Sequence, residues 1–244
     1  MSNTTLHNEN VSVTLKSLGA ELTSIKDASG TEYLWQGNPE FWSGQAPVLF
    51  PIVGCLRNGT ATIGDNKTCS FGRHGLARRL EFDLVSSSDT SITYSLKAND
   101  KTKEQYPYDF ELQMTYELTE HGVKVSHTVI NHDSVVMPYC VGGHPAFNCP
   151  VFENESFEDY IVEFEQPENA ACAQLTEDGL INNADRVSVL ENEAVIPVRH
   201  SLFYKDALVF DALKSRKVAL KHKKTGHGIL VSFPDFDYLG VWSS

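Results

Sequence analysis

The sequence predicts an all-β protein, a large antiparallel β-sandwich, and three observations support that class. Apolar and polar residues alternate along many short segments, most clearly over residues 110–118. Turn-forming Ser-Gly and Asn-Gly pairs, as at residues 29–30 and 58–59, separate these segments. No stretch longer than about two turns combines a helical period with helix caps. Helix is therefore expected only in short pieces, at residues 39–42 and 101–105.

The clearest strands are residues 110–118 and 123–129, which both alternate and are joined by a turn-like stretch, so they predict an antiparallel hairpin. Residues 150–192 are acidic and lack such a pattern, and we interpret them as an irregular excursion from the sheets. The other expected strands are short segments flanked by turn residues, at 11–15, 22–26, 61–63, 80–86, 91–97, 160–165, 208–210, 218–222, 228–233 and 238–242.

The length of 244 residues allows one large domain or two small ones. Hydrophobic residues make up 41% of the chain, enough for a sizeable core. No linker, repeat or break in composition interrupts the pattern of short strands. The sequence therefore predicts a single β-sandwich domain over residues 1–244.

The charge balance argues against several classes of partner. Acidic residues outnumber basic ones by 32 to 20, a net charge of −12, so an affinity that depends on neutralising nucleic acid or anionic lipid is not expected. The longest apolar run, residues 46–53, is too short to span a membrane, and residues 1–10 have no apolar leader. Five irregularly spaced cysteines favour reduced thiols and a cytoplasmic location.

Two segments in the first third of the chain present basic side chains beside glycines. Arg57 precedes a turn, where its guanidinium can hold a hydroxyl or carboxylate, although a solvated turn arginine is the commoner case. His74 lies between two glycines and near Arg73, Arg78 and Arg79. The glycines let a ligand approach the imidazole, and the positive charge disfavours a second proton on it. A loop that needs glycine only for its turns is the open alternative.

A second histidine, His144, follows two glycines and precedes Pro145, which favours extended backbone at the histidine. An imidazole so placed can donate a proton near neutral pH. Cys140, His144 and Cys149 supply only three potential zinc ligands at a spacing typical of no metal finger, so packed thiols explain the cysteines better. No metal site is expected.

Asp206 opens a short apolar strand, where its carboxylate can accept hydrogen bonds from hydroxyl groups, although an exposed aspartate at a strand start is common. The sequence has no Gly-x-Ser-x-Gly elbow, no phosphate-binding glycine loop of the Walker type and no dinucleotide fingerprint. Serine hydrolysis, nucleotide hydrolysis and hydride transfer therefore lack support, which leaves proton transfer or binding.

Several of these segments, taken together and in order, resemble the aldose 1-epimerase (mutarotase) family, in particular its galactose-mutarotase-like branch associated with lactose operons. The resemblance implies a large antiparallel β-sandwich, the galactose mutarotase-like supersandwich, that binds a free sugar and interconverts its α and β anomers without metal or cofactor. The segments that carry it cover nearly the whole chain: residues 34–37, 41–42, 47–54, 74–78, 143–148, 206–210, 213–216 and 239–242.

By this resemblance His144 looks like the general acid at the ring oxygen, and His74 like the second histidine at the same end of the sugar. Asp206 resembles the family's substrate-binding aspartate. Related sequences commonly carry a basic residue directly after the glycine equivalent to Gly54, where this chain has Cys55, so Arg57 is the candidate for that role.

The family's general base is a glutamate on a strand that follows the segment resembling residues 238–242. The chain ends at Ser244 and no residue matches that glutamate, so we expect it to lack the C-terminal strands of the family domain. Two alternatives stay open: a non-catalytic carbohydrate-binding or regulatory protein on the same fold, and a hexose-6-phosphate mutarotase, with which Arg73, Arg78 and Arg79 are compatible.

Overall fold

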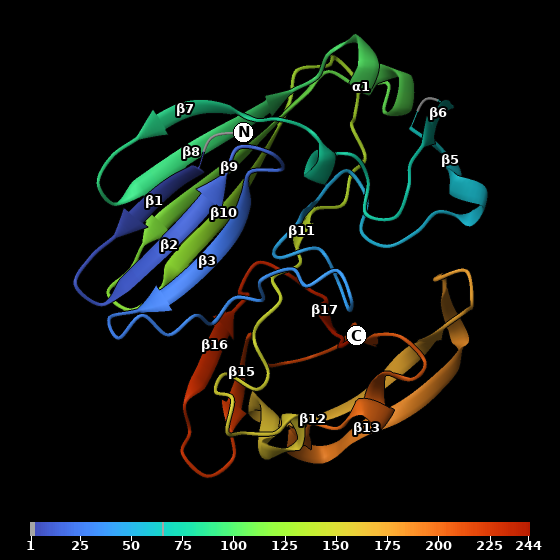
Figure 1. Cartoon of the computed structure of the whole chain (residues 1–244). Coiled ribbons are helices and arrows are strands. Elements are labelled where there is room, and N and C mark those ends of the chain that lie inside the picture. The colour runs from blue at the N-terminus through green and yellow to red at the C-terminus, as the bar shows by residue number, and fades with distance from the viewer. Residues whose placement is uncertain (1–2, 65) are drawn as a thin grey trace. The chain divides into compact units, whose positions relative to one another are not determined.

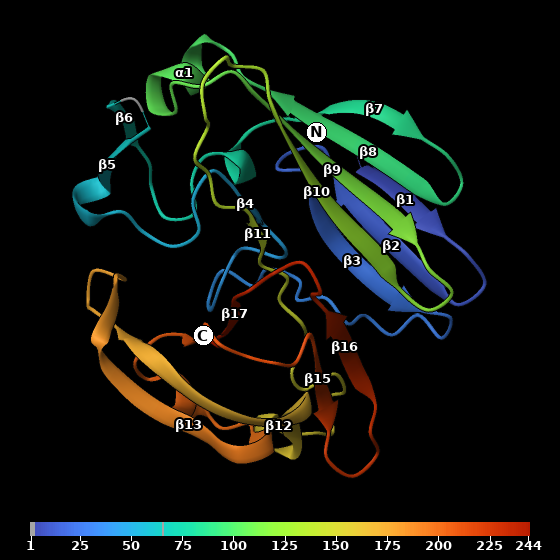
Figure 2. The ribbon, with the colours of Figure 1, turned by 180° about the vertical axis from the view of Figure 1, so that it is seen from behind.

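Strands account for nearly all the regular structure in the computed structural model, which describes residues 3–64 and 66–244 and confirms the predicted all-β class (Figures 1 and 2). Within these residues α1 (Asp100–Gln105) is the one α-helix. Contacts divide the chain into unit 1 (Met1–Ala146) and unit 2 (Phe147–Ser244), and each unit is described by itself.

Unit 1 is built on two antiparallel sheets. The predicted hairpin is confirmed, with Phe110 paired with Asn131 at one end and Leu118 with Val123 at the turn. One sheet consists of β1 (Asn3–His7), β2 (Val11–Lys16) and β3 (Glu21–Asp27), and the other has the order β10-β9-β8-β7, with β7 (Asp83–Ser87), β8 (Ser91–Lys97), β9 (Phe110–Leu118) and β10 (Val123–Asn131).

The two sheets of unit 1 lie face to face around an apolar core (Figures 1 and 2). The alternating residues of β2 and β9 turn one side chain in two inward, so that Leu15 and Leu112 are completely buried. The hydroxyl of Tyr116 on β9 donates to the carbonyl of Ala20 beside β3, which links the sheets through the core. The period-two pattern of the sequence thus marks the buried face of each sheet.

Glu111 on β9 is a buried carboxylate held by neutral and basic side chains. Gln113 and Ser95 donate to its Oε1 at 2.7 and 2.8 Å, and His132 Nε2 lies 3.2 Å from Oε2. The hydrogen bond from Gln113 has the largest effect on its pKa. With the bonds from Ser95 and His132 and the charge of Lys97, it outweighs burial and lowers the pKa of Glu111 from 4.5 to about 2.

This lowered pKa predicts an acid-dependent contribution to stability. The contribution is fully present above the unfolded value of 4.5 and is lost as the pH falls toward 2. Glu111→Gln is therefore expected to destabilise the protein at pH 7, and its difference from the wild type should shrink as the pH is lowered to 3, as measured by urea unfolding. Glu117→Gln, which removes an exposed carboxylate of the same strand, is the control. A difference that does not change with pH would contradict the prediction.

Outside its two sheets, unit 1 contains several short strands and turns, and Phe50 anchors one of these segments in the core. Phe50 follows β4, is completely buried and packs against Tyr106 and Phe110, with ring centroids 5.9 and 5.1 Å away. These elements are β4 (Val48–Leu49), which pairs with β11 (Gly142–Gly143), the hairpin of β5 (Thr60–Ile63) and β6 (Lys67–Ser70), and the 3₁₀ turns η1 (Arg57–Gly59) and η2 (Ala77–Arg79).

One local prediction in unit 1 is wrong, and another is confirmed with a later start. Residues 39–42 form a single turn closed on the carbonyl of Asn38, which accepts from the N–H groups of Phe41 and Trp42, and they do not continue as a helix. The strand predicted at residues 80–86 begins only at Asp83, because the backbone before it is hydrogen-bonded to the turn between β2 and β3. The helix predicted at residues 101–105 is confirmed as α1, and Asn99 caps it through its side chain.

Unit 2 contains one antiparallel sheet whose longest strands are β12 and β13. The prediction of an irregular excursion at residues 150–192 is wrong, because most of this segment belongs to the long β12/β13 hairpin. The sheet has the order β16-β15-β12-β14-β17, with β13 also on β12; its strands are β12 (Tyr160–Leu175), β13 (Ile181–Pro197), β14 (Leu208–Phe210), β15 (Lys217–His222), β16 (Gly228–Ser232) and β17 (Leu239–Val241), with the 3₁₀ turns η3 (Phe157–Asp159) and η4 (His200–Phe203).

Strand β12 changes partner along its length. Its first half pairs with β15, and Ala173 in its second half pairs with β14. Between these halves the register shifts around Glu168, whose buried carboxylate accepts from the N–H groups of Lys214 and Ser215. The bulge at this point bends β12, so that the same strand can pair with β15 before it and with β14 after it.

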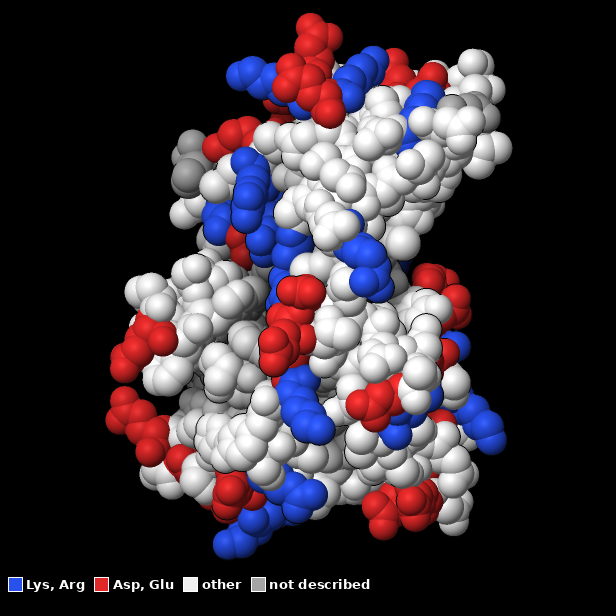
Figure 3. All heavy atoms as spheres, turned by 90° about the vertical axis from the view of Figure 1, so that its right-hand side faces the viewer, with Lys and Arg blue, Asp and Glu red and all other residues white. Residues whose placement is uncertain are grey.

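Surface charge, helix length and the state of the cysteines are the observations that concern the predicted partners and location. Figure 3 shows one face, on which several basic side chains gather in the upper half and acidic side chains are scattered over the rest. Among residues 3–64 and 66–244, no helix has both the length and the apolar character that crossing a membrane requires. All five cysteines lie in the described residues, and each is a free thiol.

Candidate functional site

His74 is held in a tight turn by reciprocal hydrogen bonds with Gly54. The N–H of His74 donates to the Gly54 carbonyl at 2.8 Å, and the N–H of Gly54 donates to Nδ1 of His74 at 3.0 Å. Because Nδ1 accepts, the ring proton lies on Nε2, which makes Nε2–H a hydrogen-bond donor. His74 has a φ of 69°, and Gly75 after it has a φ of 75°. The turn therefore fixes both the position and the tautomer of this imidazole.

Gly75 connects this turn to the core of unit 1. It forms a parallel bridge with Phe50, whose carbonyl accepts from the N–H of Leu76 at 2.9 Å. A Cβ atom at Gly75 would lie 2.2 Å from the Phe50 carbonyl oxygen, so no larger residue fits without moving the backbone. The buried ring of Phe50 thus anchors the main chain that presents His74.

His144 is placed by the short strand β11. The pairing of β11 with β4 brings this segment beside residues 48–49, and the N–H of His144 donates to the Pro47 carbonyl at 3.1 Å. The ring centroids of His74 and His144 lie 5.6 Å apart, with an angle of 68° between the ring planes. Two imidazoles that are 70 positions apart in the sequence thus lie next to one another, edge to face, in unit 1, and both are partly exposed.

The environment of His144 favours its neutral form. Burial lowers its pKa below the ordinary value of 6.5, a local backbone hydrogen bond opposes this, and the positive charges of Arg78 and Arg73 lower the pKa further. Once protonated, such an imidazole is a stronger acid than free histidine, and it is present in a smaller fraction at pH 7.

The indole of Trp42 packs beside His144, with ring centroids 5.0 Å apart and an interplanar angle of 37°. Gly44 makes room for this indole, since a Cβ there would lie 2.4 Å from the ring. Trp42 could not be selected for this role before the structure was known, because the contact joins residues far apart in the chain.

Trp42 makes the protonation of His144 measurable, because a protonated imidazole quenches indole fluorescence more strongly than a neutral one. We expect the fluorescence to fall on acidification with a midpoint below pH 6.5, since the pKa of His144 is lowered. Trp42→Phe and His144→Gln should each abolish this transition. A midpoint at or above 6.5, or a transition that survives His144→Gln, would contradict the assignment.

The other two predicted site residues, Arg57 and Asp206, are each described within their own unit. Arg57 is exposed in η1, and among the described residues its guanidinium makes no hydrogen bond or ion pair. Asp206 belongs to unit 2, where it has a φ of 73° in the turn between η4 and β14 and accepts from the N–H of Ala207 at 2.7 Å. The roles of both residues stay predictions.

The structure gives Arg73, which the sequence analysis named only as one of three arginines near His74, a specific contact. Arg73 Nε donates to Sγ of Cys55 at 3.3 Å. Its guanidinium therefore lies beside the position directly after Gly54, where the resemblance leads one to expect a basic residue. The contact joins residues 18 positions apart, which the reciprocal bonds between Gly54 and His74 help to bring together.

Unit 2 holds a cluster with metal-ligand chemistry: one ligand atom from each of Glu155, His222 and His227 lies within 4.8 Å of the others. The N–H groups of Lys224 and Thr225 donate to Nδ1 of His222, so its proton lies on Nε2. His227 bridges the Thr225 hydroxyl, 2.6 Å from Nδ1, and Glu155, 3.1 Å from Nε2. A ligating histidine normally donates its second N–H, so these hydrogen bonds fit a structural link better than a metal site.

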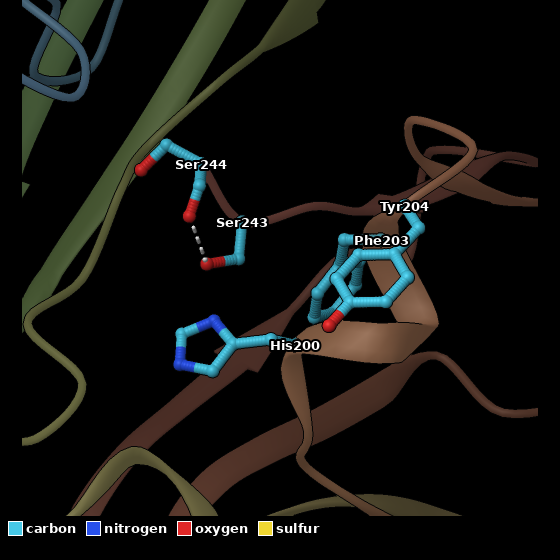
Figure 4. A pocket seen from close by; sticks show the side chains of 5 residues that line it. All are labelled: His200, Phe203, Tyr204, Ser243 and Ser244. Carbon is cyan, nitrogen blue, oxygen red and sulfur yellow. Dashed lines mark hydrogen bonds between the residues drawn. The ribbon is translucent and has the colours of Figure 1, made fainter.

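A small cavity in unit 2 is a weaker candidate for a ligand site (Figure 4). It is lined by His200, Phe203, Tyr204, Ser243 and Ser244 and has a volume of about 80 Å³. Ligand pockets usually span about 300–1,000 Å³. This cavity is too small for a sugar, and His200 already stacks on Phe157 with ring centroids 4.3 Å apart.

The fold and the site define a β-sandwich protein that carries two neighbouring imidazoles on loops of unit 1. The model of the family described as Aldose 1-epimerase matches residues 2–243. The plasmid and chromosomal forms of Protein LacX from Lactococcus lactis subsp. lactis are each 43% identical over 245 residues, which covers 98% of this chain and 82% of theirs. The chain therefore belongs to the aldose 1-epimerase family.

Solved structures agree with this assignment. A galactose mutarotase related enzyme from Lactobacillus acidophilus is 33% identical and aligns with a TM-score of 0.93 over 99% of this chain and 80% of its own. A galactose mutarotase-like protein from Lactobacillus casei is 31% identical, with a TM-score of 0.91 over 99% of this chain and 83% of its own. The galactose mutarotase-like fold expected from the sequence is confirmed.

Proposed function

We propose that the protein is an aldose 1-epimerase that interconverts the α and β anomers of an aldohexose by acid–base ring opening. The observation that carries the proposal is the pair His74 and His144, whose rings lie edge to face 5.6 Å apart on two loops anchored to the core of unit 1. Membership of the aldose 1-epimerase family supports a sugar substrate.

In this mechanism a base takes the proton of the anomeric hydroxyl while His144 protonates the ring oxygen, and the bond between that oxygen and the anomeric carbon breaks to give the aldehyde. The resemblance assigns the base to a glutamate that no residue of this sequence matches, so the residues named here supply the acid and the binding groups and the activity depends on a base beyond them. Rotation about the adjacent carbon–carbon bond and closure on the other face complete the exchange. The Nε2–H of His74 donates a hydrogen bond at the same end of the sugar. No cofactor takes part in these steps.

Asp206 and Arg57 are the proposed substrate-binding residues. A carboxylate such as Asp206 accepts hydrogen bonds from sugar hydroxyls, and the planar fork of Arg57 donates to hydroxyl or carboxylate oxygens. We also propose the cytoplasm as the location, which the five free thiols support.

Polarimetry tests the proposal directly. Freshly dissolved α-glucose or α-galactose should reach its equilibrium rotation faster with the protein than in buffer, in proportion to protein concentration. Saturable sugar binding without any acceleration would reject the enzyme and favour the alternative, a non-catalytic carbohydrate-binding or regulatory protein on the same fold.

A further inference from the structure

The antiparallel pairing of β4 with β11 continues in the same register beyond these two strands and reaches His144. The N–H of His144 donates to the Pro47 carbonyl at 3.1 Å. The N–H of Ala146, two residues further on, donates to the Gln45 carbonyl at 2.8 Å. Residues 45–47, which we call the support segment, thus lie opposite His144 and hold its main chain.

This pairing contains fewer hydrogen bonds than a regular antiparallel ladder, in which two residues of a hydrogen-bonded pair exchange two N–H···O bonds. Pro47 has no N–H group, so its pair with His144 has one bond. The carbonyl of Ala146 accepts from the N–H of Trp35 at 2.9 Å, while the N–H of Gln45 opposite it donates to a carboxylate. The support segment therefore depends on contacts outside the ladder to hold His144 in one position.

Glu21, the first residue of β3, provides these contacts. Its Oε1 accepts from the N–H groups of Gln45 and Ala46 at 3.1 and 2.9 Å, so one oxygen atom fixes two consecutive residues of the support segment. Its Oε2 lies 2.6 Å from Nζ of Lys16, the residue paired with it on β2. Glu21 is 6% exposed, so water does not compete for these bonds. The sheet of β1, β2 and β3 thus holds the support segment through a buried carboxylate.

The residues that lead into the support segment carry the indole that contacts His144. Trp42 packs beside His144 with ring centroids 5.0 Å apart, and the carbonyl of Trp42 accepts from Nε1 of Trp35 at 2.7 Å. A movement of the support segment would therefore displace two neighbours of His144, its main-chain partner and its aromatic contact.

We propose that Glu21 is a positioning residue for the proton transfer: by fixing the support segment to β3, its carboxylate sets where the imidazole of His144 lies. This inference rests on the proposed function, in which His144 delivers a proton to the ring oxygen of the sugar. Proton transfer needs heavy atoms within about 2.6–3.2 Å, and a misplacement of about 1 Å can reduce a rate about 10²-fold. Because the donors of the support segment are neutral N–H groups, the role requires an acceptor oxygen at the right reach and does not require a negative charge.

The test compares two conservative substitutions that separate reach from charge. Glu21→Gln keeps the length of the side chain and an oxygen that accepts from both N–H groups, but it removes the charge. Glu21→Asp keeps the charge but is shorter by one carbon–carbon bond, about 1.5 Å, so it reaches the support segment only if the main chain moves. A role confined to the ion pair with Lys16 would instead make Glu21→Gln the more damaging of the two.

The matched control is Glu111→Asp, which shortens another buried carboxylate of unit 1. Glu111 is 7% exposed, and it accepts from the side chains of Ser95 and Gln113 rather than from the support segment. Each protein is compared by its urea midpoint, by kcat and KM from polarimetry, and by the part of the fluorescence change on acidification that His144→Gln abolishes. The fluorescence signal reports the contact between Trp42 and His144 without any need for turnover.

In Glu21→Asp, kcat should fall about 10–100-fold while KM stays within about threefold of the wild type. The fluorescence change should lose amplitude, because the indole and the imidazole no longer keep their contact. Glu21→Gln should match the wild type in kcat and in fluorescence, although the loss of its ion pair lowers the urea midpoint. Glu111→Asp should lower only the urea midpoint.

The outcomes separate the role of Glu21 from the proposed function. If the wild type turns over sugar and folded Glu21→Asp keeps the wild-type kcat and fluorescence, the positioning role is overturned and the epimerase stays intact. A greater loss in Glu21→Gln than in Glu21→Asp also overturns it. If Glu21→Asp loses the fluorescence change, Glu21→Gln keeps it and no protein accelerates mutarotation, the positioning of His144 is supported and the epimerase is rejected.

Discussion

Replacing His144 with glutamine is expected to lower kcat for mutarotation by about 10²–10⁴-fold, the usual contribution of a positioned acid or base. Glutamine keeps a polar side chain of similar reach but cannot deliver a proton to the ring oxygen. Polarimetric initial rates over a range of sugar concentrations separate this loss of kcat from a change in KM.

The control for this variant is His121→Gln, which replaces an exposed histidine whose Nε2 lies 3.4 Å from Oε1 of its sequence neighbour Glu120. It should match the wild type in rate and in urea midpoint. If His144→Gln keeps its fold, as judged by the urea midpoint, and retains a rate within about threefold of the wild type, His144 is not the acid.

Gly75→Ala is expected to reduce the free energy of unfolding by about 2–4 kcal/mol, because the strain of a positive φ adds to an overlap with fixed backbone. A Cβ at Gly75 would lie 2.2 Å from the Phe50 carbonyl oxygen, and the φ of Gly75 is 75°. The turn must move to relieve this contact, so the imidazole of His74 moves with it. Mutarotation should therefore be impaired even under conditions where the variant is folded.

Gly72 lies in the same turn and provides a matched control. A Cβ there would meet no atom within 4 Å, and its φ is not in the positive range. Gly72→Ala should be close to the wild type in urea unfolding and in rate. Equal stabilities of the Gly75 and Gly72 variants would show that the contact with Phe50 does not constrain the turn.

The sequence predicted strands well where one face is buried and the other is not. Strands β8 and β9 alternate because every second side chain enters the core of unit 1. Strand β13 was missed because its first eight residues, from Ile181 onward, are all exposed, so no alternation marks them. Strand β12 was only partly predicted, since its register shifts break the period where it changes partner.

The two histidines could be selected from the sequence because glycines lie on both sides of His74 and directly before His144, and glycine marks places where the main chain turns sharply. Arg73 and Trp42 were not selected as site residues, because their importance depends on contacts with Cys55 and His144 that only the folded main chain creates. The residues next to a position in the sequence do not show which distant residues it contacts in the fold.

The reciprocal hydrogen bonds between Gly54 and His74 limit which sequence changes the two loops that contain these residues can accept. They lock two stretches of main chain together, so that Cys55 and Arg73, each next to a locked residue, meet side by side. An arginine at position 55 or at position 73 would therefore place its guanidinium in the same part of unit 1. The double substitution Cys55→Arg with Arg73→Gln would therefore move the positive charge from one loop to the other without changing the main chain that carries both.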